Sequence, residues 1–318
     1  MATYKEIHGI NVQYRASDAP EIEGDVWYNS STGKLKMYSA LGSWASGGTM
    51  NTGASLITGT GSQTAGLSAG GEVGPPSTYG NSEEYNGSTW TAGGNLTSAR
   101  AQLASTGSAG SQTAALCFLG RTAPAAVALV EQYDGSSWTE IADCNTARRE
   151  SPGGSGTTTA CVAFAGGEAL AITESWNGTS WTEVADLNTG REYVADAGDS
   201  GTSALCIGGG PSATDVVETW NGTSWTEVGD LNTARKVHAG AGGTTAALAF
   251  GGSTGSTVTI TEQYDGSTWA EVADLPTAKT DGAGTGTSSL ALSFGGGGPV
   301  DTTEEWSMAA AVQTVAFD

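Results

Sequence analysis

Aromatic and aliphatic residues recur along the chain at nearly fixed intervals, separated by polar and glycine-rich stretches. Residues 218–235, ETWNGTSWTEVGDLNTAR, have edited copies that begin at Glu83, Glu131, Glu174 and Glu262, and a truncated copy begins at Glu304. The aromatic residues near the start of each copy are 48, 43, 44, 44 and 42 residues apart. A period of roughly 40 to 50 residues is the signature of a propeller or a solenoid.

Each copy has the pattern of a β-hairpin. A short strand ends at the aromatic residue, and Asn-Gly or Asp-Gly supplies the two positive-φ residues of a type I′ turn. A second strand then carries a tryptophan, which is Trp90, Trp138, Trp181, Trp225 or Trp269. With a small-residue strand before each hairpin and one further strand after each copy, every repeat supplies about four strands, the number a propeller blade needs.

The small-residue strands end in glycines, and there are six of them. They end near Gly71, Gly120, Gly167, Gly210, Gly252 and Gly298. The sequence therefore predicts an all-β fold, a propeller of six blades.

Paired glycines, then Glu-x-aromatic, then a tryptophan about six residues before a leucine and an arginine resemble the kelch repeat. The resemblance covers roughly residues 41–308. Kelch repeats form β-propellers, so the resemblance implies that fold. It implies little about function, because propellers carry many activities.

The segment around Trp44 is predicted to close the ring. LGSWASGGTMNTGAS aligns with STWTAGGNLTSARAQ, so that Trp44 matches Trp90 and Ala54 stands where the copy has Arg100. The last repeat breaks off after Trp306 and lacks its own tryptophan strand. We expect the Trp44 strand to fill that gap, which would remove open sheet edges. Residues 41–318 would then be the propeller domain, with a strand at residues 312–317 that adds to the last blade or pairs with the leader.

Residues 1–40 lie outside the repeat and are predicted to be an attachment segment. GDVWYNSSTGKLKMY is typical of a hairpin, with strands at residues 25–29 and 34–38. This pattern is similar to short segments of tailed-phage fibre and tail-associated proteins, and its combination with the glycine-rich repeats resembles proteins of marine phages. The candidate attachment residues are Trp27, Tyr28, Lys34 and Lys36.

The charge of the chain excludes one class of partner. Its 33 acidic residues against 12 Lys and Arg give a net charge of −21, which repels the phosphates of nucleic acids. We interpret the charge as solubility of the surface. Neither a secretory signal nor a membrane span is visible in the sequence, so we expect no membrane insertion.

The four cysteines indicate buried small side chains. Cys117, Cys161 and Cys206 fall on the small-residue strands, and Cys144 stands where other copies have leucine. Because their spacing matches neither a zinc site nor a disulfide framework, we expect no metal.

Glutamate and a cation recur once per repeat. The glutamates are Glu83, Glu131, Glu174, Glu218, Glu262 and Glu304, and the cations are Arg100, Arg148, Arg191, Arg235 and Lys279. Since a single active site does not need one copy per blade, we interpret them as structural ion pairs or as acceptors for backbone groups. The recurring tryptophans are likewise interpreted as packing between blades, not as a sugar-stacking array.

Candidate catalytic chemistry is sparse. The two histidines, His8 and His238, do not supply the ligands of a galactose-oxidase-like copper site, and neither a nucleophile elbow nor a phosphate loop is present. The loops at residues 71–81 and 121–130 break the repeat, and a function specific to this protein would lie there.

The sequence thus predicts a structural protein of a phage particle, without enzymatic activity or cofactor. Its N-terminal segment would bind other virion proteins, and its propeller would meet a glycan or protein of the host surface. Two alternatives stay open: a non-viral kelch-type adaptor that binds proteins, and a glycan-active propeller enzyme such as a sialic-acid mutarotase or a lyase.

Overall fold

The computed structural model of the protein describes residues 12–18, 25–74, 77–298 and 300–314. Apart from one 3-10 helix, η1 (Gly107–Ala109), all described elements are β-strands, which confirms the all-β class. The chain divides into two compact units, Met1–Ser43 with Ser307–Asp318, and Trp44–Trp306. In the described part, no helix is long and apolar enough to cross a membrane.

Five of the sheets are antiparallel and four-stranded, which confirms the predicted strand content of a repeat, and the sheet that contains β26 to β28 has six strands, in the order β1, β2, β3, β28, β27, β26. Sheet 1 contains β4 (Thr58–Ser62), β5 (Ala65–Ala69), β6 (Ser82–Tyr85) and β7 (Trp90–Ala92). Sheet 2 contains β8 (Ala104–Ser105), β9 (Ala115–Phe118), β12 (Val130–Tyr133) and β13 (Trp138–Glu140), with a small hairpin of β10 (Arg121–Thr122) and β11 (Ala125–Ala126) beside it. Sheet 3 contains β14 (Gly153–Thr157), β15 (Ala160–Phe164), β16 (Thr173–Trp176) and β17 (Trp181–Glu183).

The next two sheets follow the same order. Sheet 4 contains β18 (Ala195–Ser200), β19 (Ser203–Ile207), β20 (Val217–Trp220) and β21 (Trp225–Glu227). Sheet 5 contains β22 (Ala239–Gly243), β23 (Ala246–Phe250), β24 (Thr261–Tyr264) and β25 (Trp269–Glu271). Sheet 6 contains β26 (Ala283–Gly286), β27 (Leu290–Phe294), β28 (Thr303–Thr314) and, from the N-terminal side of the chain, β3 (Lys34–Ser46).

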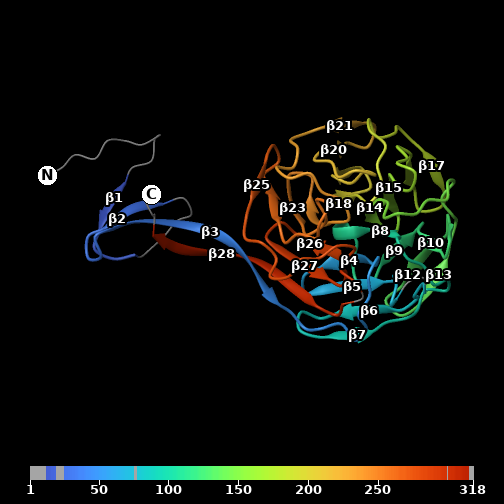
Figure 1. Cartoon of the computed structure of the whole chain (residues 1–318), viewed down its shortest axis with the longest axis horizontal. Coiled ribbons are helices and arrows are strands. Elements are labelled where there is room, and N and C mark those ends of the chain that lie inside the picture. The colour runs from blue at the N-terminus through green and yellow to red at the C-terminus, as the bar shows by residue number, and fades with distance from the viewer. Residues whose placement is uncertain (1–11, 19–24, 75–76, 299, 315–318) are drawn as a thin grey trace. The chain divides into compact units, whose positions relative to one another are not determined.

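The first strands of the sheets surround a common axis (Figure 1). Each inner strand contacts the next one around this axis, and β26 contacts β4. Small residues are required there because the strands converge: a Cβ on Gly240 would lie 2.3 Å from the carbonyl oxygen of Asp196 in the neighbouring sheet. This arrangement is typical of the β-propeller class.

A series of backbone hydrogen bonds links the loops that lead into the inner strands. The N–H of Gln102 donates to Leu56, that of Tyr193 to Glu150, that of Val237 to Tyr193 and that of Asp281 to Val237, at 2.7 to 3.0 Å. The N–H of Leu56 donates in turn to the carbonyl oxygen of Asp281, at 2.7 Å. The first and last of these loops are therefore joined directly.

The Asn-Gly and Asp-Gly turns differ from the prediction of a type I′ turn. The register Tyr85↔Trp90 leaves a loop of four residues, 86–89, and of these only Gly87 has a positive φ, at 89°. The reason is that the side chain of Asn86 accepts the backbone N–H groups of Ser88 and Thr89 through Oδ1. The asparagine itself therefore need not adopt a left-handed conformation.

The smaller unit is a sheet in the order β1, β2, β3, β28. β1 (Gln13–Arg15) pairs parallel with β2 (Val26–Asn29), and β2 pairs antiparallel with β3, with Asn29 opposite Lys34. The predicted hairpin of residues 25–38 is thus present. β28 brings the tail of the chain into the same sheet, although residues 315–317 of the strand predicted at 312–317 lie outside the described residues.

Candidate functional site

The repeated glutamates and cations meet in buried ion pairs. The pairs are Arg100–Glu131, Arg148–Glu174, Arg191–Glu218, Arg235–Glu262 and Lys279–Glu304, each with its N and O atoms 2.9 to 3.1 Å apart. Each cation thus pairs with the glutamate of the following copy, not of its own. Burial lowers the pKa of Arg148, Arg235 and Lys279, while the glutamate beside each counteracts this shift.

The four glutamates that pair with arginine also accept backbone hydrogen bonds from the loop that enters their sheet. Glu218 accepts the N–H groups of Asn188 and Thr189 and the side-chain amide of Asn188. Carboxylate, cation and loop thereby form one unit that joins consecutive sheets. Such a group satisfies most of its buried polar atoms, although Nε of Arg148, Arg191 and Arg235 has no hydrogen-bond partner among the described residues.

Glu83 is the exception, because Ala54 stands at the position of the arginine. It is buried, and it accepts the N–H groups of Asn51 and Thr52 and the amide of Asn51, at 2.8 to 2.9 Å. Within the described chain, neither Lys nor Arg lies within ion-pair distance of this carboxylate.

The repeated tryptophans pack between sheets. Trp90, Trp138 and Trp225 donate their Nε1–H to Thr303, Ser82 and Thr173, a hydroxyl at one equivalent position of the preceding sheet. Trp44 does the same toward Thr261, at 3.1 Å, and contacts Phe250. At this position sheets 2 and 4 carry Val130 and Val217. Trp181 donates instead to the carbonyl oxygen of Ala142, and Nε1 of Trp269 has no acceptor in the described part of the chain.

The attachment candidates all lie in the smaller unit. Trp27 is fully buried, with the Arg15 guanidinium 5.2 Å from its ring and its Nε1–H donated to Asp18. Tyr28 is half-buried and stacks on Tyr14, whose side chain is 67% exposed. Lys34 is exposed and Lys36 donates to Thr314. The two tyrosines and Lys34 are therefore accessible to a partner, whereas Trp27 packs inside the smaller unit.

All four cysteines are buried and free. Burial raises the pKa of the Cys206 thiol to about 12 and shifts the pKa values of the other three in the same direction. They pack in the cores between sheets, as expected of small apolar side chains.

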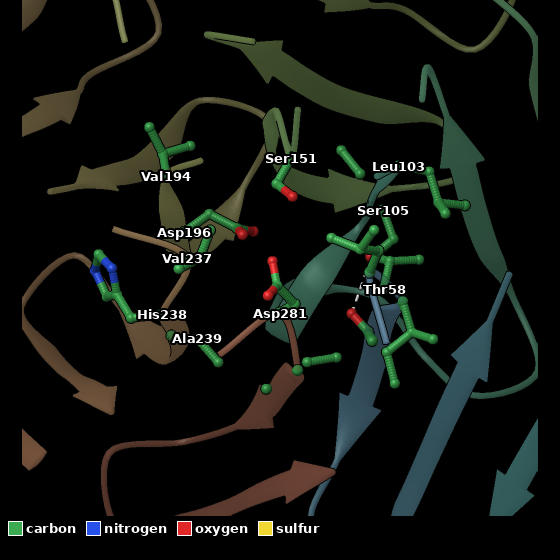
Figure 2. A pocket seen from close by; sticks show the side chains of 18 of the residues that line it. Thr58, Leu103, Ser105, Ser151, Val194, Asp196, Val237, His238, Ala239 and Asp281 are labelled. Atoms are coloured by element: carbon green, nitrogen blue, oxygen red, sulfur yellow. Dashed lines mark hydrogen bonds between the residues drawn. The ribbon is translucent and has the colours of Figure 1, made fainter. Parts of the chain in front are cut away.

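The side chains that do not repeat gather at the axis. A cavity of about 60 Å³ is lined by residues from all six inner strands or the loops that lead into them. In Figure 2 the carboxyl groups of Asp196 and Asp281 point toward its middle, as does the hydroxyl of Ser151, while the ring of His238 is turned away. Burial raises the pKa of Asp196 to about 7 and that of Asp281 in the same direction.

Sequence reasoning missed Asp196, although a signal was present. Aligned by strand pairing, the equivalent residues of the other five sheets are Gly59, Ser105, Gly154, Gly240 and Gly284. A charged side chain at a position otherwise occupied by glycine or serine marks a departure from the repeat. A function specific to this protein was expected in the loops at residues 71–81 and 121–130. These loops contribute an ion pair between Glu72 and Arg121. Residues 75–76 lie outside the described residues.

More non-repeated groups lie beside this cavity. Glu192 is hydrogen-bonded to Glu150. The pKa of Glu192 is raised mainly by burial and, to a smaller extent, by this hydrogen bond. Lys236 lies over the ring of Tyr193, with Nζ 5.6 Å from its centroid. Among the described residues, no three His, Cys, Asp or Glu side chains are arranged to hold a metal ion. These groups can exchange protons and accept hydrogen bonds.

Comparison of the sequence with models of protein families and with curated proteins finds no match.

Proposed function

We propose that the protein is a non-enzymatic structural protein of a phage particle, a tail fibre, tail-associated or capsid-decorating protein. It would present a six-bladed, kelch-like propeller to the host surface or to other virion parts. The observation that carries the proposal is the buried state of the repeated polar residues, with relative exposures of 0% to 5%. Residues that hold a ring together at every repeat suit a display scaffold better than a single active site.

A closed ring is the favoured arrangement of the larger unit. The hydrogen bond from Leu56 N–H to Asp281 supports it, because it joins the first and last loops of the series. Trp44 supports it as well, since its bond to Thr261 repeats the bond of Trp90 to Thr303 one sheet further on. β3 would then supply the outer strand of the sixth blade.

Attachment is assigned to the smaller unit. It holds the sequence that does not repeat, and a docking contact needs a unique surface, whereas near-identical sheets offer similar ones. The stacked pair of Tyr14 and Tyr28 with the exposed Lys34 would provide the contact with other virion proteins. Aromatic side chains of this kind are enriched at protein interfaces.

Mass spectrometry of purified phage particles tests the proposal. The protein is expected among the particle proteins at a fixed copy number. Its absence from particles would favour the protein-binding adaptor.

The glycan-active enzyme is favoured by one observation, the two aspartates that line the axial cavity and point toward its middle (Figure 2). Paired carboxyl groups carry out glycoside chemistry in many enzymes. Release of reducing sugar from host glycans, lost in both Asp196→Asn and Asp281→Asn, would support that alternative.

A further inference from the structure

Two of the hairpins at the axis depart from the repeat. In sheet 2, four residues, 107–110, stand where sheet 1 has Gly61 alone, and most of them form η1. In sheet 4, Asp199 is an extra residue of β18, a β-bulge between Gly198 and Ser200. A bulge turns a side chain out of the regular alternation of a strand, and bulges are common beside functional sites. These two departures are therefore candidates for a function that the repeat itself does not need.

Both departures line one cavity of about 330 Å³. Ser108 and Ala109 of η1 form part of its wall, together with Asp199 and turn residues of sheets 5 and 6. η1 contacts the inner strands of the other five sheets, and the hydroxyl of Ser108 accepts the N–H of Gly242 at 3.3 Å. Ser105, which precedes η1, lines the smaller axial cavity instead. η1 thus lies between the two cavities, so that the larger one suits an end group rather than a chain that passes through it.

The carboxylate of Asp199 is held in place with one oxygen free. Its Oδ2 accepts the backbone N–H and the hydroxyl of Thr244 in sheet 5, at 2.9 and 3.1 Å, and the hydroxyl of Ser203 at 3.4 Å. Its Oδ1 accepts no hydrogen bond from the described residues. A Cβ on Gly243 would overlap this carboxylate, so the glycine gives it room. The protein therefore fixes the orientation of Asp199 and leaves Oδ1 able to accept a hydrogen bond from a ligand.

Hydroxyl groups supply the other polar atoms of the wall. Ser108 donates its hydroxyl proton to none of the described residues, and the hydroxyls of Thr245 and Ser288 form no hydrogen bond with them. These three side chains come from η1, sheet 5 and sheet 6. The residues that line the cavity include no Lys, Arg, His or aromatic residue. The wall thus offers donors and acceptors on several sides, and a single negative charge.

This wall selects against three kinds of ligand. An anion would meet the charge of Asp199 without a cation to bind it. An apolar group would leave the polar atoms without partners. A lone ammonium group would reach one side of the wall only, whereas a ring that carries several hydroxyls can bind all sides at once.

We propose that this cavity binds the terminal neutral sugar of a glycan, with Oδ1 of Asp199 accepting a hydrogen bond from one of the sugar hydroxyls. The volume lies at the lower end of small-molecule sites, roughly 300 to 1,000 Å³, and suits about one or two sugar rings. The inference deepens the proposed function, because it names what the larger unit binds at the host surface. It rests on that function only for the source of the glycan.

A glycan array probed with the labelled full-length chain tests the ligand class. Glycans that end in galactose, glucose or mannose should bind, whereas those that end in glucosamine or sialic acid should not. The free oligosaccharide that binds best is then titrated into the chain by isothermal titration calorimetry.

Asp199→Asn should weaken this binding about tenfold. Because Thr244 would hold the amide oxygen, the amide NH2 would face the ligand where the wild type has an acceptor. Thr245→Val, which removes one hydroxyl of the wall, should weaken binding about threefold. Glu227→Gln is the matched control: it removes the same charge from the exposed outer strand β21 of the same sheet, and it should bind as the wild type.

Equal affinities of the wild type and Asp199→Asn would overturn the inference, as would binding to none of the neutral termini or to glucosamine or sialic acid alone. The purified chain is used throughout, so failure here is distinct from failure of the proposed function. Protein found in particles but unaffected by Asp199→Asn would overturn this site only. Protein absent from particles, with binding that depends on Asp199, would support the site and overturn the virion assignment.

Discussion

A single carboxylate on a strand of this protein binds both a loop and a cation. Glu218 receives two backbone N–H groups, an amide and the guanidinium of Arg191, all from the preceding connection. Glu83 receives the same backbone and amide donors without a cation. The two sites therefore separate the contribution of the charge pair from that of the backbone bonds.

Replacing Glu218 with glutamine should lower the free energy of unfolding by about 3 kcal/mol, because Arg191 is left as an uncompensated buried charge. Glu83→Gln should lower it by about 1 kcal/mol, since only hydrogen bonds are disturbed. Urea unfolding of both variants measures the difference. Equal losses would mean that the arginine contributes little to the effect.

Trp269 offers a gain in stability. Val217→Thr would give its Nε1–H the hydroxyl that Thr173 gives Trp225, and the unfolding free energy should rise by about 1 kcal/mol. Val130→Thr is the control, because Trp181 already donates to the carbonyl oxygen of Ala142. If both variants were equally stabilised in thermal melts, the missing acceptor would not be the reason.

At the level of strands and loops, β3 is the element on which the last sheet depends. Its Trp44 contacts Phe250 and Trp306, with ring centroids 5.0 and 5.4 Å apart, and Gly47 just after it donates to Thr303. Without this strand, sheet 6 would end at β28 with an open edge, which favours aggregation.

Deleting residues 1–48 removes β3 and should lower the melting temperature far more than deleting residues 1–22, which leaves β2 and β3 in place. Differential scanning calorimetry of both truncations measures this. Identical melting temperatures would show that β3 is dispensable for the larger unit. Residues 1–11 and 19–22 lie outside the described residues, so the comparison rests on β1 to β3.

The repeating hairpins could be predicted because aromatic residue, turn and tryptophan recur in a fixed order, as at Tyr85 and Trp90. The turn type could not, because it depends on whether the Asn86 side chain takes the backbone N–H groups. The partner of each arginine was also hidden, since Arg191 meets a glutamate in the following copy. Asp196 stood out from the repeat in sequence, but its environment arises only where six distant strands converge.

For the whole molecule, the division into two units separates the repeats from the sequence that does not repeat. The larger unit contains the repeats, and the smaller one combines β1, β2, β3 and the end of β28. Ten Trp in 318 residues and periodic ion pairs make an ordered array of a chain with 49 glycines.

Removing residues 1–22 should abolish incorporation into phage particles while the larger unit remains folded, because β1 and its exposed Tyr14 are lost. Particle-bound protein can be quantified by immunoblot, with circular dichroism as the control for folding. Normal incorporation would place the anchor on the larger unit instead. A double variant of Lys34 and Tyr28 to alanine tests the same surface without truncation.

The offset of the ion pairs has a consequence for how such a chain can grow. Each connecting loop binds the glutamate of the following sheet. A duplicated stretch that runs from one tryptophan strand to the next therefore carries both a loop that binds a glutamate and a glutamate that another loop binds. Gene duplication can thus add or remove such modules without redesigning their junctions. The junction at Ala54 and Glu83 differs, since Ala54 stands where the other junctions have a cation, and it marks the start of the series of modules.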